Sequence, residues 1–316
     1  MSFSADVKKE LSRVEELKKC CMLAEISGFL RLSGSIQLAG GGKLSLKLTT
    51  EDPAIARLFL RRMKAYFGAS CSLRVEENAP LKKGRVYELT ISPDEGSELI
   101  LRETGILLVR EGYNYFSEEV LDSLVKKKCC KRAFLRGVFL GGGTVSQPDK
   151  GYHLDMVCDS EALANDVRKL VNSFGLKAKV VQRRNKFVVY LKEAEQICDL
   201  LGILGAHTQL LEYQNVRIVK EAKNLTNRIA NCENANMDRA AANAARQRED
   251  ILLIQDKMGL EELEDGLREV AQLRLSHPEK SLAELAQLMD PPLTKSGING
   301  RLRKIHALAE AIRLEN

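Results

Sequence analysis

The sequence predicts an α+β protein in which a domain built from two similar halves precedes an all-α domain. Three observations support this prediction. One segment of the chain occurs twice with the same spacing of glycines, each copy is followed by short alternating strands, and the C-terminal region carries helix signals without strand patterns. The repeat is considered first, because an overlooked repeat leads to a wrong fold assignment.

The repeated segment begins with Lys-Lys-Cys-Cys in both copies, at Lys18 and at Lys127. Superposing these starting points aligns two pairs of glycines, Gly28 with Gly137 and Gly34 with Gly143. Downstream the offset between the copies shrinks, so the second copy has shorter loops. We expect repeats at about 18–107 and 127–204 in a domain covering 1–214, then a helical linker at 215–250 and a second domain at 251–316.

Each repeat shows the same order of elements: a helix carrying the glycines, two strands, a helix, two strands and a closing helix, or αββαββα. Alternation of apolar and polar residues predicts strands at Lys43–Thr49 and Lys186–Leu191. Gly40–Gly42 predicts a turn before the first of them. Asp52 followed by Pro53 predicts a helix start, because proline suits the first helical position.

The glycines lie within otherwise apolar helices. Glycine costs about 1 kcal/mol relative to alanine inside a helix, so some interaction must offset this cost. Two repeats related by a pseudo-two-fold axis would bring these helices into close contact, at Gly28, Gly34, Gly137 and Gly143. Gly141 and Gly142 extend the second set. The alternative is that the glycines merely end the helices and begin turns.

Two nine-residue segments, Ile26–Gly34 and Leu135–Gly143, resemble the motif of the LAGLIDADG homing endonucleases. In that family each motif helix ends in an acidic residue just before the last glycine, and the two carboxylates hold divalent metal for phosphodiester hydrolysis. This chain has Ser33 and Gly142 at those positions. Oxygen ligands, preferably carboxylates, are what Mg²⁺ requires. The resemblance therefore implies the fold, while we expect no catalytic residue, no metal and no enzymatic activity.

A second resemblance covers essentially the whole chain. The segments Ser2–Leu11 and Asn227–Asn236 are similar to the WhiA family, bacterial regulators that join a degenerate LAGLIDADG domain to a helix-turn-helix domain. The resemblance implies sequence-specific DNA binding and a role in cell division and chromosome segregation, with control of sporulation in some lineages. It also implies a pseudo-two-fold LAGLIDADG-like domain followed by an all-α helix-turn-helix domain.

Residues near the C-terminus carry their own helix-turn-helix signal. Ser281 and Glu284 form a capping box, Asp290–Pro292 breaks the helix, and Thr294 or Ser296 can cap a second helix. The spacing of Ile298, Leu302, Ile305 and Ala309 predicts its buried face. The opposite side would enter a major groove, where asparagine reads adenine and arginine reads guanine. Its candidate DNA-binding residues are Lys295, Ser296, Asn299, Arg301, Arg303, Lys304 and His306.

A polar stripe recurs at helical spacing in the linker. Its members are Arg217, Lys220, Asn224, Arg228 and Asn231. They are candidates for contacts with the DNA backbone, which set the register of a domain without reading sequence. The alternatives are a solvated helix face or contacts between domains. On the sheets, Lys43 and Lys47 share one face, as do Lys179 and Arg183, and we expect only weak, non-specific DNA affinity there.

Charge and composition further restrict the classes of function that the sequence allows. The net charge of +6 comes entirely from 1–214, since 215–316 is neutral. Locally, 291–304 holds four basic residues and no acid, whereas an acidic helix face is predicted from Glu261, Glu262, Glu264, Asp265 and Glu269. No apolar run is long enough to span a membrane, and the N-terminus lacks an apolar signal core. The eight cysteines include no Cys-x-x-Cys pair, so we interpret them as reduced, mostly packed thiols; the alternative is a redox or metal role.

The sequence therefore predicts a cytoplasmic, nucleoid-associated, monomeric protein that binds double-stranded DNA, without a cofactor and without a membrane. Proteins of the transcription or division machinery are candidate partners. Two other classes stay open. One is a maturase or endonuclease-derived protein that acts on RNA. The other is a protein-interaction scaffold tethered to the nucleoid.

Overall fold

The computed structural model describes residues 2–15, 18–77 and 85–314. The chain folds into two compact units, one covering Met1–Lys220 and the other Glu221–Asn316. A single long helix, α8 (His207–Lys257), contributes to both units and contains the helical region predicted at 215–250.

The first unit contains the predicted order of elements twice, which confirms the αββαββα repeat. The first copy consists of α2 (Lys19–Ser33), β1 (Gly34–Leu38), β2 (Leu44–Thr50), α3 (Pro53–Phe67), β3 (Ser72–Glu77), β4 (Arg85–Ile91) and α4 (Ser97–Glu103). The second copy consists of α5 (Lys128–Gly142), β7 (Gly143–Val145), β8 (Leu154–Cys158), α6 (Glu161–Asn172), β9 (Lys179–Arg183), β10 (Lys186–Leu191) and α7 (Ala194–Leu204).

Each copy forms one antiparallel four-stranded sheet. The strand orders are β1-β2-β4-β3 and β7-β8-β10-β9, which correspond position by position. In the first sheet Ile36 pairs with Leu46 and Leu48 pairs with Leu89, so one face of the sheet is apolar and buried. Because side chains alternate along a strand, Lys43 and Lys47 lie on the opposite face, as the sequence pattern predicted.

Local sequence signals account for the helix starts. The Asp52 side chain accepts a hydrogen bond of 2.7 Å from the backbone N–H of Ala54, and Pro53 is the first residue of α3. Gly68 ends that helix with a φ of 67°, a left-handed conformation that glycine adopts without strain. The predicted turn at Gly40–Gly42 is present, with positive φ at all three glycines.

Some elements were not predicted from the sequence. A short helix, α1 (Phe3–Leu11), precedes the first repeat, with Ser2 as its N-cap. A hairpin of β5 (Leu107–Arg110) and β6 (Tyr113–Phe116) lies between the repeats. Three 3₁₀ turns complete the described elements: η1 (Pro93–Glu95), η2 (Asp122–Leu124) and η3 (Leu260–Glu262).

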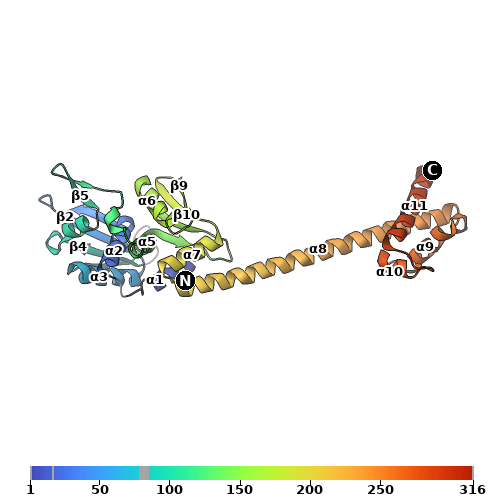
Figure 1. Cartoon of the computed structure of the whole chain (residues 1–316), viewed down its shortest axis with the longest axis horizontal. Coiled ribbons are helices and arrows are strands. Elements are labelled where there is room, and N and C mark those ends of the chain that lie inside the picture. Colours follow the sequence, from blue (N-terminus) through green and yellow to red (C-terminus); the bar gives the residue numbers. More distant parts are fainter. Residues whose placement is uncertain (1, 16–17, 78–84, 315–316) are drawn as a thin grey trace. The chain divides into compact units, whose positions relative to one another are not determined.

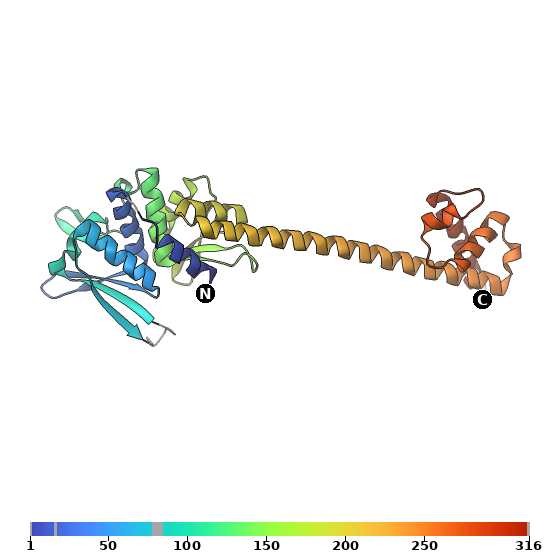
Figure 2. The same cartoon turned by 90° about the horizontal axis from the view of Figure 1, so that it is seen from below.

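The two motif helices, α2 and α5, lie side by side between the two sheets (Figures 1 and 2). Each sheet packs its apolar face toward this pair, and α3 and α6 pack against the same faces. The core of the first unit is therefore shared by both repeats. The arrangement explains why neither repeat could bury its apolar surface alone.

The second unit is entirely helical within the described residues. Its elements are the C-terminal part of α8, η3, α9 (Asp265–Ser276), α10 (Leu282–Gln287) and α11 (Lys295–Leu314). Apolar side chains from all four helices form its core, with Ile251, Val270, Ala286 and Ile305 each at most 2% exposed. This unit has its own hydrophobic core and meets that requirement for an independent domain.

Candidate nucleic-acid interface

The helix-turn-helix signal folds as the sequence predicts. The backbone N–H of Glu284 donates to Ser281 Oγ at 3.3 Å, and the backbone N–H of Ser281 donates to Glu284 Oε2 at 2.8 Å. These reciprocal bonds form the predicted capping box at the start of α10 and lower the pKa of Glu284. The helix ends at Gln287, before Asp290–Pro292.

Thr294 rather than Ser296 caps α11. The backbone N–H of Gly297 donates to Thr294 Oγ1 at 3.1 Å, and the Ser296 hydroxyl lies 2.9 Å from the same oxygen. The buried face of α11 is the predicted one, formed by Ile298, Leu302, Ile305 and Ala309. The cap and this face together fix which side of α11 points away from the core.

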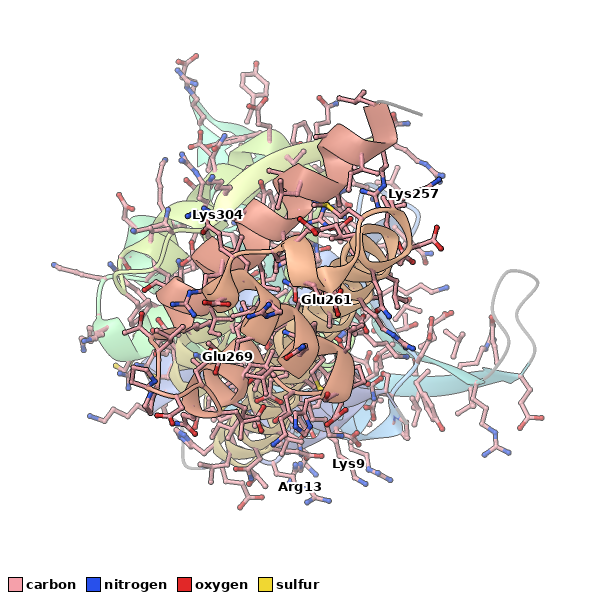
Figure 3. All side chains as sticks on the ribbon, turned by 90° about the vertical axis from the view of Figure 1, so that its right-hand side faces the viewer. Lys9, Arg13, Lys257, Glu261, Glu269 and Lys304 are labelled. Carbon is pink, nitrogen blue, oxygen red and sulfur yellow. The ribbon has the colours of Figure 1, made fainter. Side chains whose placement is uncertain are left out.

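The outward side of the first turns of α11 carries free polar groups. Lys295, Asn299 and Arg303 are spaced four residues apart and therefore share one face, with Lys304 beside them. Lys295, Arg303 and Lys304 are exposed, and Asn299 is half-buried. None of the four side chains makes a hydrogen bond or ion pair with any residue that the structure describes. Figure 3 shows Lys304 apart from Glu261 and Glu269.

Arg301 has a structural partner. Its Nη1 donates to the carbonyl oxygen of Gly266 at 3.3 Å, and its guanidinium packs against the space where a Gly266 side chain would be. Arg301 thus anchors α11 to α9. The expectation that Arg301 is free to contact phosphate is corrected to this extent, because its guanidinium already takes part in the fold.

His306 also has a structural partner, although its side chain is 39% exposed. Its Nδ1 lies 2.7 Å from Oδ2 of Asp250, whose carboxylate is 2% exposed and also receives Arg313 at 2.8 Å. The interaction holds the middle of α11 against α8. The DNA-binding role expected for His306 stays a prediction; its helical position gave no sign of this contact with a buried carboxylate 56 residues away.

The stripe along α8 divides into two parts. Arg217 pairs with Glu195 at 3.5 Å, and Lys220 donates to the carbonyl oxygens of Pro148 and Asp149 at 3.1 and 2.9 Å. Lys220 Nζ also lies 5.2 Å from the centre of the Tyr152 ring. These two residues stabilise the first unit. The other three, Asn224, Arg228 and Asn231, are exposed along α8.

The predicted acidic helix face is not a single face. Glu261 and Glu262 lie in η3, Glu264 is the N-cap of α9, and Asp265 and Glu269 lie on α9 itself. The chain turns between η3 and α9, so the helical spacing assumed from the sequence does not apply. These acidic residues all precede α11 in the chain, and residues 291–304 contain no acid.

The outer faces of the sheets carry mostly neutralised charge. Lys43 lies 3.5 Å from Asp94, Lys47 lies 2.5 Å from Glu88, and Arg183 lies 3.4 Å from Asp155. Lys179 is exposed. Because an acid accompanies three of the four basic residues, this surface attracts a polyanion less than a free basic cluster would.

The motif helices meet at Gly28 and Gly137. A side-chain carbon at Gly28 would lie 2.3 Å from the carbonyl oxygen of Phe134, and one at Gly137 would lie 2.1 Å from that of Glu25. The two contacts are equivalent under the repeat, which aligns Glu25 with Phe134 as it aligns Gly28 with Gly137. They confirm close approach of the helix backbones across a pseudo-two-fold axis.

Gly34 and Gly143 have a different role from the predicted one. A side chain at Gly34 would collide with Leu30, and one at Gly143 with Phe139, and both of these belong to the preceding helix. Each glycine ends its helix and begins a strand. The contact between helices at this end is made instead by Gly141, next to Leu32 and Ser33.

Ser33 and Gly142 are the last residues of α2 and α5. The Ser33 hydroxyl donates to the carbonyl oxygen of Gly141 at 3.2 Å. The two positions at which the LAGLIDADG resemblance expects carboxylates are thus occupied by a hydroxyl bonded to the facing helix and by a residue without a side chain.

A basic hollow between α1 and α3 was not predicted. Lys9 and Arg13 line it from α1 and the turn that follows, and Arg57 and Arg61 line it from α3. Figure 3 shows Lys9 and Arg13 together. The signal in the sequence is the four-residue spacing within each pair, but the pairs are distant in the chain. Arg61 is partly neutralised by Glu15 at 3.5 Å.

Four of the eight cysteines are packed as buried thiols, and two are exposed. All eight are free, and Cys21, Cys130, Cys158 and Cys198 are buried. Burial raises the pKa of Cys130 to about 11 and that of Cys158 to about 12. Across the described part of the chain, none of the helices combines the length and the apolar character needed to cross a bilayer.

The fold and the helix-turn-helix site define a class of protein: a LAGLIDADG-like domain of two repeats joined to a helix-turn-helix domain. Three family models match the chain. They are the WhiA N-terminal LAGLIDADG-like domain at residues 19–107, the WhiA LAGLIDADG-like domain at 131–223 and the WhiA C-terminal HTH domain at 226–309. The chain belongs to the WhiA family.

Individual relatives match this chain along its full length. The chain is 46% identical over 313 residues to a protein of Clostridium beijerinckii described as "Probable cell division protein WhiA", covering 99% of each chain. A Clostridium novyi protein of the same description is 45% identical over 315 residues, covering 100% of this chain and 99% of the other. The crystal structure of full-length DUF199/WhiA from Thermatoga maritima matches with a TM-score of 0.58 and 30% identity, covering 98% of this chain and 99% of that one.

Proposed function

We propose that this protein is a non-catalytic, sequence-specific DNA-binding regulator. The observation that carries the proposal is the contrast between two basic surfaces. On α11 the side chains of Lys295, Asn299, Arg303 and Lys304 have no partner among the described residues, whereas on the sheets three of the four candidate cations have acidic partners. The binding free energy of a polyanion is most favourable where it displaces small counterions, rather than protein carboxylates, from basic side chains.

The geometry of α11 suggests a role for each residue. The helix has an N-terminal half without acids, and an exposed N-terminal half is the part that enters a major groove in helix-turn-helix proteins. Asn299 and Arg303 lie one turn apart and can reach base edges together. Lys295, Ser296 and Lys304 flank them and suit phosphate contacts, with Arg228 and Asn231 of α8 as further candidates.

The biological role rests on the relatives. Because curated relatives covering the whole chain are described as cell division proteins, we propose the same role for this protein. We also propose that the protein controls transcription and chromosome segregation, because it belongs to the WhiA family and is proposed to bind DNA.

Selection of duplexes from a random pool by the purified full chain tests sequence specificity. We expect enrichment of a defined motif, with affinity that falls steeply as salt rises. The matched control is the Asn299→Ala/Arg303→Ala variant, which keeps Lys295 and Lys304. It should retain binding but lose the motif. Recovery of random sequence by the wild type, or tighter binding to structured RNA than to any duplex, would contradict the proposal.

A further inference from the structure

The repeat places four cysteines at equivalent positions. Cys20 and Cys21 lie in the first turn of α2, and Cys129 and Cys130 lie in the first turn of α5. The contacts of Gly28 with Phe134 and of Gly141 with Ser33 show that the two helices run in the same direction. Their first turns are therefore neighbours, and the duplicated cysteine pairs meet at the pseudo-two-fold axis.

The sulfur atoms are within reach of one ion. Those of Cys20, Cys21 and Cys130 all lie within 4.8 Å of one another. Cys129, the remaining member of the two cysteine pairs, is exposed and is the neighbour of Cys130 in the chain. Under the repeat Cys129 is equivalent to Cys20, and Cys130 to Cys21, so Cys129 is the fourth member of this duplicated set.

Burial disfavours the thiolate form of Cys130, and positive groups beside the cluster act against this effect. Neither α2 nor α5 has a side-chain cap, so no side chain occupies the N–H groups at the start of either helix, although the N–H of Cys21 donates to the carbonyl oxygen of Lys18 at 2.8 Å. Two helix N-termini contribute positive potential at this point. Lys18, Lys19, Lys127 and Lys128 lie beside the cysteines in the chain and add formal positive charge. A bound tetrathiolate with a divalent ion would carry a net charge of −2, and this environment offsets it.

We propose that Cys20, Cys21, Cys129 and Cys130 bind one Zn²⁺ ion, which joins the first turns of α2 and α5. Zinc takes four thiolate sulfurs in a tetrahedron, at about 2.3 Å each, and undergoes no change of oxidation state. Binding replaces thiol protons by the metal. The sulfurs of Cys20, Cys21 and Cys130 are close enough to supply three corners after small side-chain rotations, and rotation of the exposed Cys129 side chain supplies the fourth.

The choice of ion follows from the ligand atoms. Thiolates select soft or borderline ions, whereas Mg²⁺ and Ca²⁺ need oxygen ligands. The cluster contains sulfur alone. Its position at the start of the motif helices is also at the opposite end from Ser33 and Gly142, so the ion would have a structural role. This proposal does not depend on DNA binding.

Metal analysis of the full chain, purified under reducing conditions without chelator and then equilibrated with Zn²⁺, is the direct test. We expect one equivalent of tightly held zinc per chain, and one equivalent of Co²⁺ should give the absorption of tetrahedral thiolate-bound cobalt. Cys129→Ser should weaken binding more than about 100-fold, because loss of a mere outer partner costs about 10–100-fold. Cys232→Ser, which changes an exposed cysteine on α8, is the matched control and should bind like the wild type.

Alkylation mapped by mass spectrometry gives an independent readout. Zinc should protect the four clustered cysteines from iodoacetamide and leave Cys232 reactive. Three results would overturn the proposal: no stoichiometric metal, equal binding by Cys129→Ser and the wild type, or a disulfide between the two pairs that forms in place of metal binding. The disulfide is recognised by a mass lower by two hydrogen atoms for each bond formed.

Discussion

Glu25 of α2 and Arg136 of α5 form a buried ion pair across the two repeats, with 2.6 Å between Oε1 and Nε. The second carboxylate oxygen of Glu25 receives Arg62 of α3 at 3.0 Å. The side chain of Glu25 is 1% exposed. In the other repeat the positions equivalent to Glu25 and Arg136 hold Phe134 and Ser27, so this pair breaks the internal symmetry.

Replacing Glu25 by alanine should destabilise the first unit by about 3–5 kcal/mol, because two arginines would remain buried without their carboxylate. All seven tyrosines lie within Met1–Lys220 and the chain has no tryptophan, so tyrosine fluorescence during urea unfolding reports on this unit alone. The triple variant Glu25→Leu/Arg62→Met/Arg136→Met should lose much less stability, because no charge is left buried without its partner. Equal losses in the single and triple variants would show that packing, not charge, dominates here.

Gly28→Leu and Gly137→Leu should each destabilise the first unit by about 3 kcal/mol or more, at the upper end for overpacking. An added side chain would lie 2.3 or 2.1 Å from a backbone oxygen of the facing helix, and backbone cannot move aside cheaply. Gly202→Ala is the matched control. Gly202 is also helical, but its nearest neighbour would be 3.5 Å away, so this change should stabilise by up to about 1 kcal/mol.

The repeat made much of this core predictable. The alignment of Gly28 with Gly137 was enough to indicate a shared contact between the two motif helices. The sequence could not show that Gly34 and Gly143 have a different role from Gly28 and Gly137, because a glycine at a helix end and a glycine at a helix crossing look alike in sequence. Helix α1 and the β5–β6 hairpin lie outside the repeated pattern, so no internal comparison indicated them.

Helical spacing likewise predicted the buried face of α11 but not what surrounds its edges. Ile298, Leu302 and Ile305 recur with the period of a helix, which is a local property. The partners of Arg301 and His306 are Gly266 and Asp250, which are remote in the chain. A single sequence states which side of a helix a residue occupies, but not which distant group reaches that side.

Purified protein should not cleave DNA in the presence of Mg²⁺ or Mn²⁺. Ser33 and Gly142 supply no carboxylate at the ends of the motif helices, and divalent-metal hydrolysis depends on such ligands. Conversion of supercoiled plasmid to nicked circles is the measurement, with a nicking enzyme as positive control. Nicking that co-purifies with the protein and disappears in Ser33→Ala would refute this prediction.

Asp250→Ala should destabilise the second unit by about 1.5–3 kcal/mol, because it removes the charged hydrogen-bond partner of both His306 and Arg313. Tyrosine fluorescence does not report on this unit, so the suitable measurement is hydrogen exchange of peptides from α11. Exchange in these peptides should accelerate. Asp256→Ala, an exposed change on the same helix, should leave exchange unchanged. If Asp250→Ala exchanges like the wild type, His306 is available for another role.

Asn299→Ala and Arg303→Ala should each cost about 1–3 kcal/mol against the selected duplex and relax its sequence preference at one position. Both side chains are free and lie one turn apart on the outward side of α11. Lys295→Ala and Lys304→Ala should instead weaken all duplexes alike and lower the salt slope by about one. Titration of each variant against selected and scrambled duplexes at several salt concentrations separates the two classes.

His306→Ala sharpens the same experiment, since the Asp250 contact assigns His306 to the fold. Any loss of affinity in this variant should be equal for selected and scrambled duplexes and should accompany faster exchange in α11. If Asn299→Ala and Arg303→Ala also weaken both duplexes equally, base reading does not occur on this face. If no variant of α11 changes binding at all, the contact surface lies elsewhere, and the exposed residues Asn224, Arg228 and Asn231 of α8 become the next to substitute.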